Sequence, residues 1–117
     1  MNSSSLKVSV IILSFNQAEF IAEAINSVLN QTYKNLEIII SDNGSTDSTK
    51  EIIESFLSDK RIIFLKYTEN QSISLRQNQA AQKASGEFIS LLYADDYYLP
   101  NKIEHQIEIF STLSDEW

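Results

Sequence analysis

The sequence contains 117 residues, 43% of them hydrophobic and 21% charged, which is enough for one small globular domain spanning residues 1–117. The net charge of −7 argues against a nucleic-acid surface, which requires a basic patch. The chain has no cysteine and one histidine, which excludes disulfides and disfavours zinc sites. No apolar run approaches the roughly 20 residues of a membrane span and no signal-peptide core is present, so we expect a cytoplasmic protein.

Strand and helix patterns alternate along the chain. Runs of β-branched, aliphatic and aromatic residues predict strands over residues 7–14, 36–41, 61–66 and 87–93. Because these runs are almost unbroken, they are typical of strands buried on both faces, as in a parallel sheet. Apolar residues at helical spacing predict helices over residues 18–31, 46–57, 72–85 and 100–113.

The order β-α-β-α-β-α-β-α predicts a Rossmann-like α/β fold, doubly wound with a mostly parallel sheet. In the mononucleotide-binding arrangement, the first strand lies centrally, between the second and the fourth. Ligands then bind beyond the carboxyl ends of the strands. Three polar stretches fall at that edge, namely SFNQ (14–17), SDNGSTD (41–47) and ADD (94–96). We therefore expect a binding site where these stretches meet.

The SDNGSTD stretch places an acid, Asp42, at the end of the second strand. An acid there can accept a hydrogen bond from a ribose hydroxyl or a base N–H. Gly44 permits a tight turn but belongs to neither a GxGxxG nor a GxxxxGK[ST] phosphate-binding motif. The same residues are typical of a simple turn followed by a helix cap, so both interpretations stay open.

Two adjacent carboxylates, Asp95 and Asp96, follow the fourth strand. At about 4 Å and an effective dielectric near 20, their repulsion is on the order of 4 kcal/mol. Carboxylate oxygens are the ligands that Mg²⁺ and Mn²⁺ prefer, so one aspartate could bind a cation while the other faces a sugar hydroxyl. The alternative is a solvated turn or the N-cap of the next helix.

Three further side chains each allow two interpretations. Arg76 could bind a diphosphate or a base carbonyl through its guanidinium, or it could be a solvated surface charge. Phe15 could flank a base or belong to the core. His105 is interpreted as a solvated histidine rather than a ligand.

Together, residues 7–49 and 86–104 resemble the N-terminal half of family 2 glycosyltransferases with the GT-A fold, and the resemblance extends from about residue 7 to residue 110. It implies transfer of a sugar, with inversion, from a nucleotide-diphosphate-sugar to an acceptor hydroxyl. The implied cofactor is Mn²⁺ or Mg²⁺. The implied donor is a UDP-sugar foremost, with dTDP- and other sugars as alternatives, and the implied acceptor is a saccharide or a lipid-linked molecule.

By this resemblance, the loop after the first strand lines the nucleotide base through Ser14, Phe15 and Asn16. Asp42 and Asn43 correspond to the family's acidic pair, which contacts base and ribose. Asn43 stands where the family often has Asp. Its carbonyl oxygen can still accept the N–H of a base, but its amide can also donate, so the base identity stays open.

Asp95 and Asp96 correspond to the family's version of the DXD motif. The resemblance implies that Asp96 binds the cation bridging the diphosphate, and that Asp95 contacts the ribose or the donor sugar. The family often has Arg directly before an Asn, whereas here Gln77 precedes Asn78 and Arg76 lies one place earlier. On a helix that shift is about 100°, so the expected contact of Arg76 with the nucleotide stays open.

The chain ends one helix after the ADD stretch. We therefore expect a donor-binding part, with the acceptor-binding half and the catalytic base absent, and an uncovered sheet edge that favours self-association. The main alternative is a nucleotide-diphosphate binding module without catalysis. A receiver-like signalling domain would need acidic residues at the end of the first strand, where this sequence has Ser14, Phe15 and Asn16. A hydrolase would need carboxylates on opposite sides of the scissile bond.

Overall fold

The structure, a computed structural model, describes residues 6–116, with side chains through residue 110. Its four strands are parallel and lie in the order β3-β2-β1-β4, which confirms the predicted fold and the central position of β1. The elements in chain order are β1 (Val8–Ser14), α1 (Ile21–Leu29), β2 (Leu36–Asn43), α2 (Thr49–Glu54), β3 (Ile62–Tyr67), α3 (Ile73–Lys83), β4 (Phe88–Tyr93) and α4 (Lys102–Glu116).

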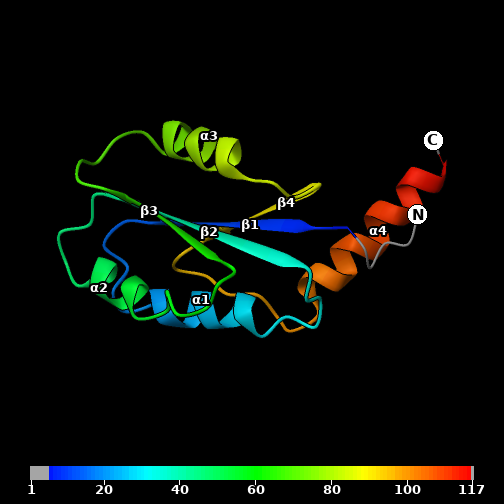
Figure 1. The fold of residues 1–117 in the computed structure, drawn as a ribbon, viewed down its shortest axis with the longest axis horizontal. Helices are drawn as coiled ribbons and strands as arrows, with labels where there is room; N and C mark the ends of the chain where they lie inside the picture. Colours follow the sequence, from blue (N-terminus) through cyan, green and yellow to red (C-terminus); the bar gives the residue numbers. More distant parts are fainter. Residues whose placement is uncertain (1–5, 117) are drawn as a thin grey trace.

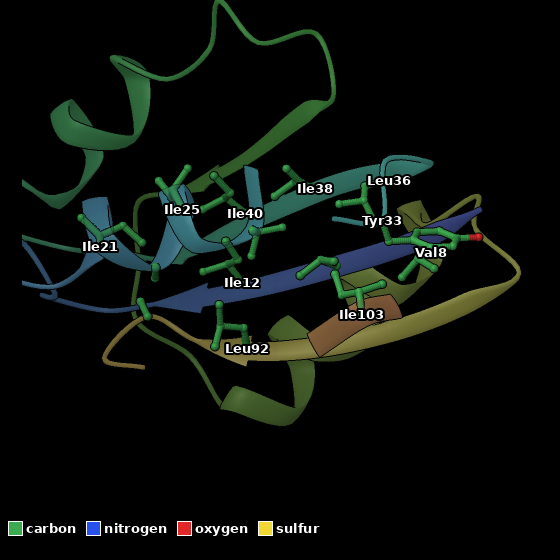
Figure 2. Packing of buried hydrophobic residues seen from close by; sticks show 14 of the residues in the cluster. Val8, Ile12, Ile21, Ile25, Tyr33, Leu36, Ile38, Ile40, Leu92 and Ile103 are labelled. Atoms are coloured by element: carbon green, nitrogen blue, oxygen red, sulfur yellow. The ribbon is translucent and has the colours of Figure 1, made fainter. Parts of the chain in front are cut away.

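Helices cover the two faces of the sheet unequally. Figure 1 shows α3 alone on one face and α1 and α2 on the opposite face, while α4 extends beyond the end where the strands begin. The larger core cluster lies on the α1 side, where Figure 2 shows Ile21 and Ile25 of α1 near Ile12 and Ile40 of the strands. Burying one such side chain contributes about 1.5–3 kcal/mol. This packing holds the carboxyl ends of β1 and β2 in fixed positions.

The face under α3 has a smaller core, formed by Ile11, Leu13, Ile39 and Ala80. The helix covers β1 and β2 there, whereas β4 is an edge strand among the described residues. On β4, side chains that alternate with the buried Leu92 stay exposed, at Ile89, Leu91 and Tyr93. Among residues 6–116, no helix is long and apolar enough to cross a membrane.

The second strand is longer than the sequence predicts and includes Asp42 and Asn43. Both residues pair with β3, where they lie opposite Lys66 and Tyr67. Gly44 then adopts a φ of 78°, and a Cβ at this position would lie 2.6 Å from the carbonyl carbon of Glu69. The turn therefore requires glycine, as predicted, because any larger residue would collide with the backbone.

Candidate functional site

A cleft of about 410 Å³ opens at the carboxyl ends of β1, β2 and β4, beside the start of α3. Its polar lining comes from Ser14, Gln17, Ser41, Asn43, Arg76, Asp95 and Asp96. Its apolar lining comes from Leu13, Phe15, Ile73, Tyr93 and Ala94. The three polar stretches that the sequence places at this edge thus do meet around one cavity, and α3 adds a fourth wall.

Asp42 does not line this cleft, because its side chain is fully buried behind it. Its Oδ1 accepts hydrogen bonds from Ser14 Oγ at 2.7 Å and from Ser45 Oγ at 2.6 Å. Its Oδ2 accepts from the Ser45 backbone N–H at 2.9 Å. The carboxylate therefore ties the end of β1 to the turn after β2. A contact of Asp42 with base or ribose stays a prediction, and it would require this network to open.

Asn16 also supports the site from outside the cleft. Its backbone adopts a φ of 52°, a left-handed conformation that asparagine tolerates better than most residues. Its Oδ1 accepts from the Thr46 N–H at 2.8 Å, and its own N–H donates to Ser45 Oγ at 2.8 Å. The neighbouring Phe15 lines the cleft with 41% of its surface exposed, so it is not a core residue.

Arg76 forms the basic part of the cleft wall and is only 4% exposed. Its Nε donates to Asn43 Oδ1 at 2.7 Å, Nη1 to Gln79 Oε1 at 3.0 Å and Nη2 to the Glu69 carbonyl at 2.6 Å. Its guanidinium carbon lies 3.7 Å from the ring centre of Tyr67. The interpretation of Arg76 as a solvated surface charge is therefore wrong.

The hydrogen bonds and the ring contact of Arg76 are with neutral groups, and among the described residues it forms no ion pair. A buried guanidinium is normally paired with an anion, because transfer of an unpaired charge out of water is costly. Two of its five N–H groups remain without a hydrogen bond to the described residues. The cleft therefore presents a positive group with spare donors to an anionic or carbonyl-bearing ligand.

The amide of Asn43 is held by the segment that leads into α3. Its Oδ1 accepts from the Gln71 N–H at 2.9 Å as well as from Arg76, and its Nδ2 donates to the Gln71 carbonyl at 2.8 Å. Two donors occupy both lone pairs of Oδ1. Acceptance of a base N–H by this oxygen would therefore require one of these bonds to break.

Asp95 and Asp96 are both exposed at the cleft. Asp96 Oδ1 accepts from the Tyr97 N–H at 2.8 Å, within a turn closed by a bond from the Asp96 N–H to the Tyr93 carbonyl. Water screens the repulsion between exposed carboxylates, so it is smaller than the sequence-based estimate. Neither residue caps α4, which begins at Lys102, so the helix-cap interpretation is wrong, while a solvated turn is what the structure shows.

The two carboxylates fit a hard divalent cation that brings other ligands with it. Among the residues that the structure describes, no group of three or more His, Cys, Asp or Glu side chains could hold a metal by itself. Mg²⁺ typically uses one or two protein carboxylates and completes its coordination with water and phosphate oxygens. The donor set at Asp95 and Asp96 therefore suits a cation that binds together with a phosphate-bearing ligand.

Three side chains of α4 that could exchange a proton, Glu104, His105 and Glu108, do not line the cleft. Glu104 instead accepts from Thr32 Oγ1 at 2.6 Å, near the end of the sheet where the strands begin. From this arrangement, none of the three residues can be assigned the role of general base.

The sequence placed Gln17 and Ser41 at this edge only as members of the polar stretches, without a role of their own, and it did not indicate Ile73; all three line the cleft. For Ser41 a signal was present, since it is the first polar residue after the apolar run 38–40 of the second strand. For Ile73 a signal was also present, since it begins a helix that otherwise has few apolar residues.

Residues 9–115 match the sequence model of glycosyl transferase family 2. The chain belongs to this family. An uncharacterized glycosyltransferase of Rickettsia typhi is 44% identical to it over 115 residues, which are 98% of this chain and 35% of the relative. A UDP-Glc:alpha-D-GlcNAc-diphosphoundecaprenol beta-1,3-glucosyltransferase of Escherichia coli is 41% identical over 90% of this chain and 41% of its own length.

A solved structure agrees with the family assignment. Residues 1–349 of S. aureus TarS, crystallised with UDP, match this fold with a TM-score of 0.80 at 26% identity. The match covers 92% of this chain and 32% of that one. The structural match confirms the GT-A type of fold. The chain spans about a third of the length of the Rickettsia typhi relative and of this TarS chain.

Proposed function

We propose that this chain is the donor-binding part of an inverting family 2 glycosyltransferase. It binds a nucleotide-diphosphate-sugar together with Mn²⁺ or Mg²⁺, and the sugar passes to an acceptor hydroxyl of a saccharide or a lipid-linked molecule. The observation that carries the proposal is one cleft that combines Arg76, which is buried and forms no ion pair within the part of the chain that the structure describes, with the exposed carboxylates of Asp95 and Asp96. A nucleoside diphosphate with its cation matches both charges.

Each cleft residue has a role in this proposal. Asp96 would hold the cation, which when bound neutralises charge on the departing diphosphate. Asp95 would accept from the ribose or the donor sugar. The ring of Phe15, exposed at the cleft, offers a face on which the base can stack. The spare N–H groups of Arg76 would donate to the diphosphate or to a base carbonyl.

A uridine nucleotide is the donor that the relatives support. The E. coli relative is named for UDP-Glc, and the TarS structure contains UDP. Sequence identities of 41% and 26% to these proteins make the same nucleotide the first candidate here. A dTDP-sugar or another nucleotide-sugar is the alternative.

Binding without turnover is the second candidate function. It is favoured because the acid–base residues of α4 do not line the cleft, so among the described residues no group is assigned to take the acceptor's proton. Hydrolysis of a UDP-sugar by this chain distinguishes the two functions. Measurable turnover would support catalysis, and tight binding with no turnover would support the binding module.

Isothermal titration calorimetry with UDP, dTDP, GDP and CDP, each with Mn²⁺ and with excess chelator, tests the proposed function. We expect at least one diphosphate, UDP foremost, to bind with Mn²⁺ and to bind more weakly when the metal is chelated. If none of the four binds under either condition, the proposal is wrong.

A further inference from the structure

Ser41 combines three properties that are rare together. Its side chain is fully buried, it lines the cleft, and among the described residues its hydroxyl has no hydrogen-bond partner. Buried hydroxyls in folded proteins are almost always paired, because an unpaired one loses its bonds to water without compensation. An unpaired hydroxyl at a binding cleft therefore indicates a group whose partner is the ligand.

The neighbouring acceptors on β2 are already occupied. Side chains alternate along a strand, so Ser41 and Asn43 point to the cleft side of the sheet and Asp42 points to the opposite side. Both lone pairs of Asn43 Oδ1 are used, and the carboxylate of Asp42 receives three hydrogen bonds. Along this strand, Ser41 Oγ is thus the cleft-side oxygen that can still accept.

The groups near the end of this strand have spare hydrogen-bond donors rather than acceptors. Counting bonds to the described residues, Arg76 has two N–H groups to spare and Asn43 has one, while neither has a free side-chain acceptor. This part of the cleft therefore presents several donors and one acceptor. A uracil edge is its complement, because an N3–H donor lies between two carbonyl acceptors.

We propose that Ser41 Oγ accepts a hydrogen bond from the N3–H of a uracil base, or of a thymine base with the same edge, and so favours these nucleotides over those of cytosine, whose N3 only accepts. This inference rests on the proposed nucleotide-sugar function and adds the residue that reads the base. Ser41 takes the place of Asn43, which the resemblance matches to the family's base- and ribose-contacting pair, because the Asn43 oxygen already accepts two hydrogen bonds within the protein.

The substitution Ser41→Ala separates recognition from structural support. Because the hydroxyl has no hydrogen-bond partner to lose among residues 6–116, we expect the Tm to stay unchanged or to rise. The Kd for UDP in the presence of Mn²⁺ should weaken about two- to tenfold, the range of one hydrogen bond. UDP methylated at N3 should bind wild type more weakly than UDP does, and this methylation penalty should shrink in Ser41→Ala.

Ser9→Ala is the matched control, because Ser9 is also a fully buried serine on the α3 face but lies near the start of β1. Its hydroxyl donates to Glu37 at 2.5 Å and accepts from the Gly86 N–H at 2.8 Å. Ser9→Ala should therefore lower the Tm and leave the Kd for UDP unchanged.

The possible results distinguish failure of the Ser41 inference from failure of the proposed function on which it rests. An unchanged Kd for UDP in Ser41→Ala overturns the role of Ser41 and leaves the proposed function intact. Loss of binding together with a lowered Tm indicates a structural role and overturns it too. If wild type binds no nucleoside diphosphate, the proposed function fails and this inference fails with it. Should Ser41→Ala not fold, Ser41→Cys, whose thiol accepts only weakly, takes its place in the same comparison.

Discussion

Replacement of Asp42 by asparagine tests whether this residue supports the site or contacts the ligand. An amide has one acceptor oxygen, so it can keep the bonds from Ser14 Oγ and Ser45 Oγ but loses the bond from the Ser45 N–H. A hydrogen bond to a charged group contributes about 1.5–3 kcal/mol, and the two retained bonds fall to about half that strength. The sum predicts a loss of about 3–6 kcal/mol of unfolding free energy.

Urea denaturation and thermal melting measure this loss directly. At about 4 °C per kcal/mol for a domain of this size, the Tm of Asp42→Asn should fall by roughly 12–24 °C. Asp95→Asn removes the same charge from an exposed position and should change stability by no more than about 0.5 kcal/mol. If Asp42→Asn keeps wild-type stability but loses affinity for UDP, the residue is a ligand contact and the reasoning is refuted.

Three further outcomes follow from the contacts. Arg76→Lys keeps the charge but loses the planar set of donors. Calorimetry should therefore show that the affinity for UDP is lowered about tenfold or more. An unchanged Kd would contradict the role of Arg76. Burial raises the pKa of Glu37, but hydrogen bonds from two serines outweigh it and hold this pKa below its usual value of 4.5. The contribution of Glu37 to stability is therefore complete above about pH 4.5 and is lost as the pH falls through the lowered pKa. Below that pH, the Tm of wild type should fall more steeply than the Tm of Glu37→Gln. Parallel curves of Tm against pH would exclude this coupling. The exposed apolar side chains of β4 should promote self-association. Sedimentation velocity should show less self-association for Ile89→Lys than for wild type. Equal sedimentation distributions for the two proteins would contradict a role of the β4 edge in self-association.

The fold was predictable because its signals are local. The four apolar runs are short, separate and flanked by helical patterns, and a parallel sheet is the arrangement that buries both faces of such strands. Val8, Val10 and Ile12 on one face of β1 and Ile11 on the other are all buried, as a central strand requires. The edge that binds the ligand follows from the same topology, since the polar stretches come after the strands.

The direction of individual side chains was not predictable, because one residue of register decides which face a side chain occupies. The sequence shows Ser41, Asp42 and Asn43 as one polar stretch, and only the extension of β2 through Asn43 places the first and last of them at the cleft and Asp42 behind it. The burial of Arg76 was also hidden, because it depends on Tyr67 and the carbonyl of Glu69, which precede α3 in the chain.

The central claim is that a nucleoside diphosphate and a divalent cation bind this cleft together, with Asp96 as a ligand of the cation. Calorimetric titration of UDP into wild type and Asp96→Asn, with Mn²⁺ and with chelator, tests it most directly. We expect Mn²⁺ to strengthen UDP binding by wild type and to have little effect on Asp96→Asn. Binding of equal strength by both proteins, regardless of Mn²⁺, would contradict the account.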